Sequence, residues 1–350
     1  MKSAISVYPG LGISDADYFN YISEAKNQGI ELVFMSLHIP EANLKLLEQF
    51  KTLLNYIDSL KMKAIIDISK KVYDELDLSS ISIYGLRLDY GFSDQEIVSL
   101  CKTSTFKIFL NASTIDAEGF DKLRNLGLNP NQIGVFHNFY PKPFSGLAEE
   151  YFYEKNKFYK SLGIEVLAFT CSHFKPRLPL FKGLPTIENH RNYDIYMQLN
   201  ELLMMKVDIA CVGDAMANSE ELKIMTSYQD NFVKLRFNKI NQEILDEHIE
   251  ILKMSHKVRP DQSLYIIRSE SSRSLTKTNQ KINPKNNAGW IEPKTVTIDN
   301  LNNLRYCGEV NIWKETAKND GSFNIIGNVE ISEWMLENSE LIKEFKFILE

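Results

Sequence analysis

The sequence predicts an α/β protein, in which a (β/α)8 barrel is followed by a small all-β domain. Eight short apolar runs each precede a helix-like segment, at intervals of about 20 to 40 residues and without hairpin-length turns. Eight strand–helix units are the number that closes such a barrel. A GxGxxG fingerprint is absent, which disfavours the alternative of an open doubly wound sheet. After about residue 255, short β-type runs separated by turns replace the alternation.

The predicted barrel strands are apolar runs with polar residues at their C-terminal ends. They cover residues 4–8, 31–37, 63–69, 85–91, 107–110, 132–136, 165–169 and 207–212. In the stretch 85–91, Leu86 and Leu88 alternate with Arg87 and Asp89, so one face is apolar and the other charged. The polar mouth of a closed barrel accommodates these charges, and barrel enzymes place their chemistry at the C-terminal strand ends.

Capping signals mark several helices between these strands. Ser14 precedes an acidic first turn, and the helix that follows is expected to stop at Gly29. Ser93 and Glu96 have the spacing of a capping box. Further helices are expected at about 42–60 and 192–205, and another is expected to end near Gly127.

The expected domain boundaries follow the change in pattern. We expect the barrel at 1–235, a connecting segment at 236–260 and the small β domain at 261–350. The β-type runs of the last part cover 264–268, 295–298, 307–312 and 323–326. The final amphipathic segment, 332–349, is expected to be helical.

Composition narrows the function classes. The net charge of −6 provides no basic field, so we expect neither nucleic acid nor an anionic membrane as a partner. No window holds the ~20 apolar residues of a membrane span, and the N-terminus lacks a signal-peptide pattern. The four cysteines are scattered without a CxxC pair, which favours free thiols and disfavours a thiolate zinc site. We therefore expect a cytoplasmic location.

Polar residues gather where the predicted strands end. The carboxylates are Glu41, Asp67, Asp89 and Asp214, and the neutral residues at the same level are Asn111, His137, Asn138 and Tyr140. Two rim carboxylates are what glycoside hydrolysis needs, because one donates a proton and the other attacks the anomeric carbon or activates water. The alternative for each acid is a loop-holding hydrogen bond, and at least two of the four are expected to be functional.

Two other chemistries have weaker support. His38, Glu41 and His137 could contribute to a metal site, but no second matched pair of ligands exists. Schiff-base chemistry needs a lysine in the barrel mouth, and Lys70 is the candidate there at a strand end.

The segment 172–191 is a long loop that carries three prolines together with His, Arg and Glu residues. Long ordered loops in compact domains are usually functional, although a simple lid is the alternative. In the β domain, Arg268, Ser269 and Arg273 belong to an arginine- and serine-rich turn that could hold a phosphate or a carboxylate. A solvated charged turn is the alternative there.

Several motifs occur together in a fixed order along the chain. They are SLHIPE at 36–41, LRLDYG at 86–91, LNAST at 110–114, HNFYP at 137–141 with Gly146-Leu147, GLPTIENHR at 183–191, and the turn from Arg268 to Arg273. With these motifs the chain resembles the 6-phospho-N-acetylmuramidases over nearly its full length. One departure is Leu178, where an Arg-Gly-Pro-Leu run would have glycine, and it bears on the loop's shape and on substrate preference.

The resemblance implies a (β/α)8 barrel followed by a cyclophilin-like β-barrel domain. It implies intracellular hydrolysis of N-acetylmuramic acid 6-phosphate–N-acetylglucosamine during cell-wall recycling. From the residues themselves we expect neither a cofactor nor a metal. It leaves a homodimer open as the oligomeric state. Two alternatives remain, namely another sugar-phosphate barrel enzyme (an epimerase, aldolase or lyase) and a non-catalytic phospho-sugar binding protein.

The resemblance also implies roles for individual residues. Asp89 and Glu41 are expected to be the catalytic carboxylates. The expected substrate-binding residues are Asp67, Asn111, His137, Asn138, Tyr140, Arg177, Glu188, His190, Arg191 and Asp214, of which Asp67 and Asp214 are reserve catalytic acids. Arg268, Ser269 and Arg273 are expected to bind the phosphate or the lactyl group.

Overall fold

The computed structural model describes residues 1–37, 44–75, 83–276, 281–285 and 289–349. The chain divides into two compact units, Met1–Asp230 and Asn231–Glu350. Each unit contains its own curled sheet, so each is described separately.

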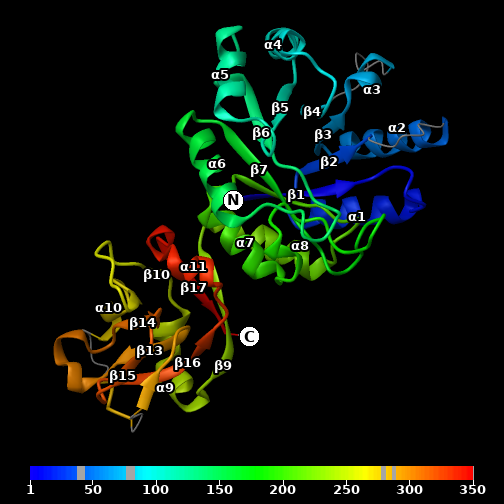
Figure 1. Ribbon diagram of the computed structural model, residues 1–350. Helices are drawn as coiled ribbons and strands as arrows, with labels where there is room; N and C mark the ends of the chain where they lie inside the picture. Colours follow the sequence, from blue (N-terminus) through cyan, green and yellow to red (C-terminus); the bar gives the residue numbers. More distant parts are fainter. Residues whose placement is uncertain (38–43, 76–82, 277–280, 286–288, 350) are drawn as a thin grey trace. The chain divides into compact units, whose positions relative to one another are not determined.

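The first unit is a closed barrel of eight parallel strands that alternate with helices (Figure 1), which confirms the predicted barrel. Its strands are β1 (Lys2–Val7), β2 (Leu32–Ser36), β3 (Lys63–Ile68), β4 (Gly85–Leu88), β5 (Lys107–Asn111), β6 (Ile133–Phe136), β7 (Glu165–Thr170) and β8 (Ile209–Val212). The ring closes between β8 and β1, where Ala4 lies in register with Cys211. Because all strands are parallel, their C-terminal ends lie at one end of the barrel.

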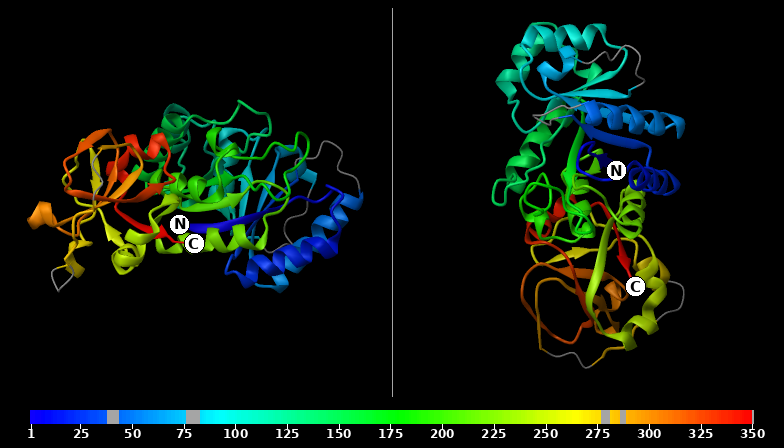
Figure 2. Two further views of the ribbon diagram at one scale, coloured as in Figure 1. Left: turned by 90° about the horizontal axis from the view of Figure 1, so that it is seen from below. Right: turned by 90° about the vertical axis from the view of Figure 1, so that its right-hand side faces the viewer.

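The helices between the strands lie around the outside of the barrel (Figures 1 and 2). They are α1 (Asp15–Asn27), α2 (Leu44–Ser59), α3 (Lys70–Glu75), α4 (Asp94–Thr103), α5 (Ala117–Asn125), α6 (Glu149–Ser161), α7 (Ile195–Met204) and α8 (Ser219–Ser227). The predicted caps are present: the Ser14 side chain accepts a hydrogen bond from the Asp17 N–H, and Ser93 and Glu96 form a reciprocal capping box.

Aromatic side chains from alternate strand positions fill the barrel interior. The rings of Phe136 and Phe169 are stacked with centroids 4.5 Å apart, and Phe34 meets them edge-on at 5.2 and 5.1 Å. All three side chains are fully buried. Such offset and edge-to-face contacts are favourable in addition to the buried area. The barrel is therefore a packed core that ends in an aromatic layer near its mouth.

Two glycines make room for a further ring of this core. A Cβ atom at Gly85 or at Gly134 would come within 2.4 Å of the Phe109 ring, from opposite edges. Glycine on β4 and on β6 thus lets Phe109 of β5 lie flat between its neighbours.

The second unit is built on a seven-stranded sheet. Its strands, in sheet order, are β10 (His256–Lys257), β17 (Glu344–Ile348), β9 (Val233–Ile240), β16 (Phe323–Val329), β13 (Thr295–Asp299), β14 (Val310–Trp313) and β11 (Ile266–Arg268). A separate pair consists of β12 (Gly289–Ile291) and β15 (Ala317–Asn319), and the helices are α9 (Gln242–Lys253), α10 (Arg273–Thr276) and α11 (Glu333–Glu337).

The two edge strands of this sheet meet. Beyond β10 and β11 the chain continues through an antiparallel bridge between Val258 and Ser269. The Arg259 N–H donates to the Arg268 carbonyl at 3.0 Å, and the Glu270 N–H donates to the Lys257 carbonyl at 2.7 Å. These bonds link the first and last strands, so that the sheet curls round on itself and few edge groups stay unpaired.

Two sequence expectations for this unit are wrong. Residues 236–260 are not a connecting segment, because they form most of β9, all of α9 and β10 within the second unit. The segment 332–349 is not one helix, because its helix ends at Glu337 and β17 follows. In β17 the buried side chains of Phe345 and Phe347 alternate with more exposed ones, which is the period of a strand.

Candidate active site at the barrel mouth

A cavity of about 320 Å³ opens in the first unit among residues at the C-terminal ends of the barrel strands. Its described lining residues are Phe34, Ser36, Asp67, Arg87, Asp89, Asn138, Phe139, Phe169 and Arg177. Phe34 and Phe169 belong to the aromatic layer of the core, so the cavity has an apolar base. The other side chains bring opposite charges together at the place where this fold carries its chemistry.

Arg87 is the centre of the polar lining. Its Nη1 lies 2.6 Å from Asp67 Oδ1 and 3.6 Å from Asp89 Oδ1, so one guanidinium stands between two carboxylates. The Asp67 side chain is only 5% exposed, whereas the Asp89 side chain is 26% exposed. Ser36 donates a hydrogen bond to the other Asp67 oxygen at 3.1 Å. Asp67 is therefore held within the wall, and Asp89 is the carboxylate that a ligand can reach.

Asn138 is fixed from two sides. Its Oδ1 accepts a hydrogen bond from Arg87 Nη2, and its backbone N–H donates to Ser113 Oγ at 2.9 Å. Behind it, fully buried His137 contacts Ser113 Oγ through Nδ1 and Asn156 Oδ1 through Nε2. Asn156 donates its own amide to the Met205 carbonyl, so His137 Nε2 carries the proton and Ser113 donates to Nδ1. His137 thus supports Asn138 from behind.

Burial lowers the pKa of His137 to about 3. The imidazole therefore stays neutral in ordinary solution and does not act as a proton donor near neutral pH.

Asp214 lies beneath the long loop. It is fully buried and accepts hydrogen bonds from the backbone N–H groups of Ser172, Arg177 and Leu184, at 3.0, 3.0 and 3.1 Å. Burial raises the pKa of Asp214, and the three N–H donors oppose that rise. Asp214 therefore shapes the 172–191 loop, and it does not line the cavity among the described residues.

Glu188 and Arg191 join two loops of the rim. Glu188 accepts the backbone N–H groups of Phe144 and Gly146 and forms an ion pair with Arg191 at 2.8 Å. Arg191 also donates to the carbonyls of Tyr140, Lys142, Lys182 and Gly183. Partial burial favours a higher pKa for Glu188, but Arg191 and the two N–H donors outweigh it and lower the pKa to about 2.

Three other residues named from the sequence also lie outside the cavity lining. His190 is fully buried with its Nε2 2.9 Å from Glu201, which is buried as well. Asn111 accepts the Ser113 N–H, and Tyr140 offers its backbone carbonyl to Arg191. Of the expected site residues, the cavity brings together Asp67, Asp89, Asn138 and Arg177. Glu41, with His38, lies outside the described residues.

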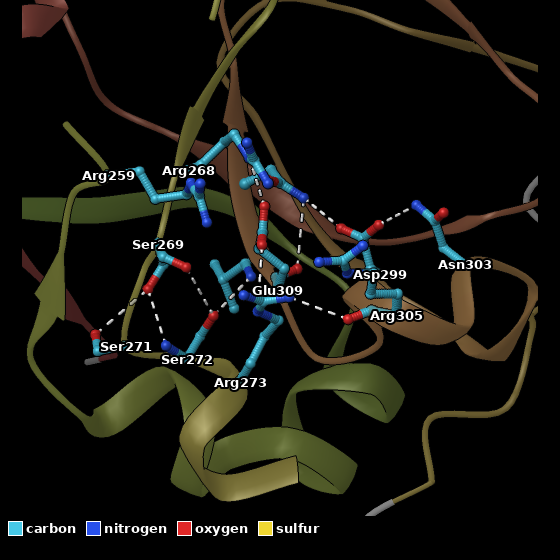
Figure 3. Close-up of polar contacts among 12 residues, drawn as sticks. Arg259, Arg268, Ser269, Ser271, Ser272, Arg273, Asp299, Asn303, Arg305 and Glu309 are labelled. Atoms are coloured by element: carbon cyan, nitrogen blue, oxygen red, sulfur yellow. Dashed lines mark hydrogen bonds and ion pairs between the residues drawn. The ribbon is translucent and has the colours of Figure 1, made fainter. Parts of the chain in front are cut away.

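In the second unit, Arg268 and Arg273 converge on the buried carboxylate of Glu309 (Figure 3). Arg268 Nε lies 2.6 Å from one Glu309 oxygen, and Arg273 Nε lies 3.4 Å from the other. Arg268 also lies 3.4 Å from Asp261, and Arg273 donates to the Arg305 carbonyl. Both guanidinium groups therefore already have acceptors.

Ser269 is fully buried, and its Oγ contacts His256 and accepts the Ser272 N–H. It is thus part of the turn's internal framework. The role expected of Arg268, Ser269 and Arg273 in holding a phosphate or lactyl group stays a prediction.

Comparison with protein families identifies the chain. Residues 4–227 match the model of the 6-phospho-N-acetylmuramidase N-terminal region, and residues 234–348 match that of the C-terminal region. The chain belongs to the 6-phospho-N-acetylmuramidase family. The family name indicates a glycosidase that acts on a phosphorylated muramic acid sugar. The resemblance found in the sequence motifs is thereby confirmed.

Two solved structures resemble this family member along their whole length. An uncharacterized B. cereus protein is 26% identical, with a TM-score of 0.85 and coverage of 99% of both chains. A conserved Enterococcus faecalis protein of unknown function is 28% identical, with a TM-score of 0.74, and the match covers 100% of this chain and 97% of the other. A comparison with curated proteins gave no match.

Several cavity residues of this muramidase family member were not expected from the sequence as site residues. Arg87 lies on the charged face of the predicted strand without an expected role, Ser36 and Phe139 belong to the motifs without an expected role, and Phe34 and Phe169 carry no site expectation. Strand alternation could have identified Arg87 as a site residue, because Arg87 and the catalytic candidate Asp89 lie two residues apart and so share a face of the strand. The aromatic residues could not be recognised as site residues from the sequence, because aromatic residues on a barrel strand are also typical of the core.

The described residues offer neither a cluster of metal ligands nor a membrane-spanning helix. No group of three or more His, Cys, Asp or Glu residues that could hold a metal ion was found there. No described helix is both long and apolar enough to span a bilayer. Among the described residues, Cys101, Cys171, Cys211 and Cys307 form no disulfide.

Proposed function

We propose that the protein is a glycoside hydrolase that cleaves N-acetylmuramic acid 6-phosphate–N-acetylglucosamine in the barrel-mouth cavity. The observation that carries this proposal is the arrangement of Asp67, Arg87 and Asp89, in which two carboxylates flank one guanidinium at the end of a cavity. The family name supplies the activity, and the cavity supplies a place where carboxylates and a sugar can meet.

Asp89 and Glu41 are the proposed catalytic pair. Asp89 lines the cavity and is the more exposed of the two described carboxylates, so it can touch a substrate. Glu41 comes after β2 in the sequence and lies outside the described residues, so its place in the pair rests on the SLHIPE motif at 36–41. One of the pair protonates the bridging oxygen, and the other attacks the anomeric carbon or activates water. Asp67 is the positioning carboxylate that orients Arg87.

Asn138 is a proposed substrate contact. Its Oδ1 and backbone N–H are engaged with Arg87 and Ser113, which fixes the side chain and directs its amide group. Phe34 and Phe169 close the base of the cavity with apolar surface. A rigid polar contact above an apolar base is an arrangement that can orient a sugar for reaction.

The first test is turnover of the phosphorylated disaccharide by the whole protein, with the products identified by mass spectrometry. Asp89→Asn and Glu41→Gln are each expected to lower kcat by roughly 10²- to 10⁴-fold, because each removes an acid–base or nucleophilic group. Asp121→Asn, which alters an exposed carboxylate that pairs with Arg124 on α5, is the matched control. Full activity of Asp89→Asn would remove Asp89 from the mechanism.

The roles of the two carboxylates can be separated with the same variants. Azide is expected to restore turnover by forming a glycosyl azide, and the anomeric configuration of this azide relative to the substrate separates the roles. Inversion indicates loss of the nucleophile, or of the base of an inverting enzyme, and retention indicates loss of the acid–base residue of a retaining enzyme. The configuration of the first-formed sugar, followed by NMR, distinguishes retention from inversion.

The surroundings of Lys70 disfavour Schiff-base chemistry at this residue. Lys70 lies 2.5 Å from Asp74 and 3.3 Å from Glu96. The hydrogen bond to Asp74, aided by Glu96, raises the pKa of Lys70, whereas an amine that attacks a carbonyl needs a lowered pKa. Lysine-dependent aldolase or lyase chemistry at this position is therefore disfavoured.

The cellular role is part of the same proposal. Cell-wall recycling in the cytoplasm would supply a phosphorylated disaccharide, and a strain without the enzyme should accumulate it. We also propose that the second unit is a cyclophilin-like barrel, supported by the hydrogen bonds that join its edge strands. Cell fractionation and mass spectrometry of the sugar pool test the first proposal.

A further inference from the structure

The feature behind this inference is the guanidinium of Arg177, which lines the cavity from the long 172–191 loop. Its Cζ lies 3.8 Å from the centroid of the Tyr8 ring and 5.5 Å from that of Phe139. Arginine on an aromatic face is attracted by the π electrons and keeps the edge of its plane available for hydrogen bonds.

Hydrogen bonds fix both the Tyr8 ring, on which Arg177 lies, and the 172–191 loop that carries Arg177. Tyr8 is fully buried, its hydroxyl donates to the Gly213 carbonyl at 2.5 Å, and its own carbonyl accepts the Tyr18 hydroxyl at 2.6 Å. The Arg177 backbone N–H donates to Asp214 at 3.0 Å, and its carbonyl accepts the Phe181 N–H. Arg177 is thus pre-positioned, which lowers the entropy lost when it binds a ligand.

The charge of Arg177 has no counterpart among the described residues. Arg87 contacts two carboxylates, and Arg191 is paired with Glu188. Arg177 forms no ion pair within the described part of the chain, and its buried Nε has no hydrogen-bond partner there. A buried donor without an acceptor is costly, so such a group usually has a functional reason.

We propose that Arg177 is the residue that recognises an anionic group of the sugar substrate inside the barrel cavity. This inference rests on the proposed function and adds that the anion is bound in the first unit. The guanidinium is suited to an oxyanion with two acceptor oxygens, which is the shared chemistry of a phosphate ester and a carboxylate. Arg268 and Arg273 of the second unit fit this task less well, because their Nε atoms already lie 2.6 and 3.4 Å from the carboxylate oxygens of Glu309 and form ion pairs with it.

The experiment compares three disaccharides with wild-type protein, Arg177→Gln and Arg177→Lys. The first carries both the lactyl carboxylate and the 6-phosphate, the second lacks the phosphate, and the third lacks the lactyl group. Arg124→Gln, which removes an exposed arginine on α5, is the matched control. Thermal unfolding of each variant verifies that it is folded.

Arg177→Gln is expected to lower kcat/KM by roughly 10- to 100-fold for the substrates that carry the recognised anion, and by less than about threefold for the one that lacks it. If Arg177→Gln leaves kcat/KM nearly unchanged only for the phosphate-free sugar, the recognised anion is the phosphate. If kcat/KM is nearly unchanged only for the lactyl-free sugar, the recognised anion is the carboxylate. Arg177→Lys should recover part of the loss, because it restores charge without the planar fork. Equal losses on all three substrates overturn the inference.

Two further outcomes separate the inference from the proposed function. If wild-type protein cleaves none of the sugars, the proposed function fails, and binding of N-acetylmuramic acid 6-phosphate measured by calorimetry then tests Arg177. Loss of that binding in Arg177→Gln supports the inference, and unchanged binding overturns it. A selective loss in Arg268→Gln but not in Arg177→Gln would place the anion in the second unit and also overturn it.

Discussion

At the scale of single residues, Arg87 contacts several polar groups of the candidate site. It is 3% exposed, and its guanidinium contacts Asp67, Asp89, Asn138 and the Phe136 carbonyl. Burying a charge is costly unless partners surround it, so Arg87 and Asp67 depend on each other. The same contacts that stabilise the barrel mouth therefore orient two cavity residues.

This dependence predicts a non-additive effect on stability. Arg87→Met is expected to lower the free energy of unfolding by about 3 to 5 kcal/mol, because it leaves Asp67 buried without its cation. The double variant with Asp67→Leu should lose less than the sum of the single losses. Urea unfolding of the wild type, both single variants and the double variant measures the coupling. Strict additivity would show that the two side chains do not stabilise each other.

At the scale of elements, the loops after β6 and β7 are joined by Glu188 and Arg191. The lowered pKa of Glu188, about 2, gives this junction a pH signature. Its contribution to stability is present above the unfolded value of about 4.3 and is lost as the pH falls through the folded value.

Glu188→Gln is therefore expected to destabilise the protein by roughly 1 to 3 kcal/mol at pH 6, and by progressively less as the pH approaches 3. Urea unfolding across this pH range measures the difference. Glu154→Gln is the matched control, because Glu154 and Lys157 have the same sequence spacing but lie exposed on α6. An equal, pH-independent loss in both variants would contradict the role given to Glu188.

The barrel was predictable because its signal is local. Alternation along a strand identifies which residues face inward, so Arg87 and Asp89 could be paired on one face from the sequence. Beyond the strand ends that rule no longer applies. Asp214 and His190 have the residue types and positions of site residues, yet the loop path turns both beneath the rim. Only the backbone hydrogen bonds of the loop reveal this.

The second unit was harder to predict for a related reason. In β9 only the first three of eight residues are continuously buried, and β17 is five residues long and follows a short helix. Both strands take their place from partners distant in the sequence, since Phe345 pairs with Val233 and His256. A periodic pattern over so few residues does not distinguish strand from helix.

At the scale of the whole molecule, the two units should respond differently to pH. Burial raises the pKa of Asp299 in the second unit to about 7, with Glu309 adding to the rise and hydrogen bonds from Asn311 and Asn303 opposing it. An acid with a raised folded pKa binds a proton more readily in the folded state. The stability of this unit should therefore fall as the pH rises through 7.

Calorimetry of the full chain tests this expectation. Between pH 8 and pH 6.5, the transition that belongs to the second unit should move up by roughly 2 to 5 °C. Asp299→Asn should be less stable, because its amide would face the donors of Asn303 and Asn311, and it should lose this pH dependence. A wild-type transition that stays constant over this interval would contradict the assignment.

The strand pairings also determine when each sheet can close during biosynthesis. The barrel ring closes where β8 meets β1, so the first strand to leave the ribosome waits for the eighth. In the second unit β17 lies between β10 and β9, so that sheet stays open until residues 344–348 have emerged. In each unit the strand that closes the sheet is thus synthesised last. A nascent chain arrested before that strand would expose unpaired strands to the cell's chaperones.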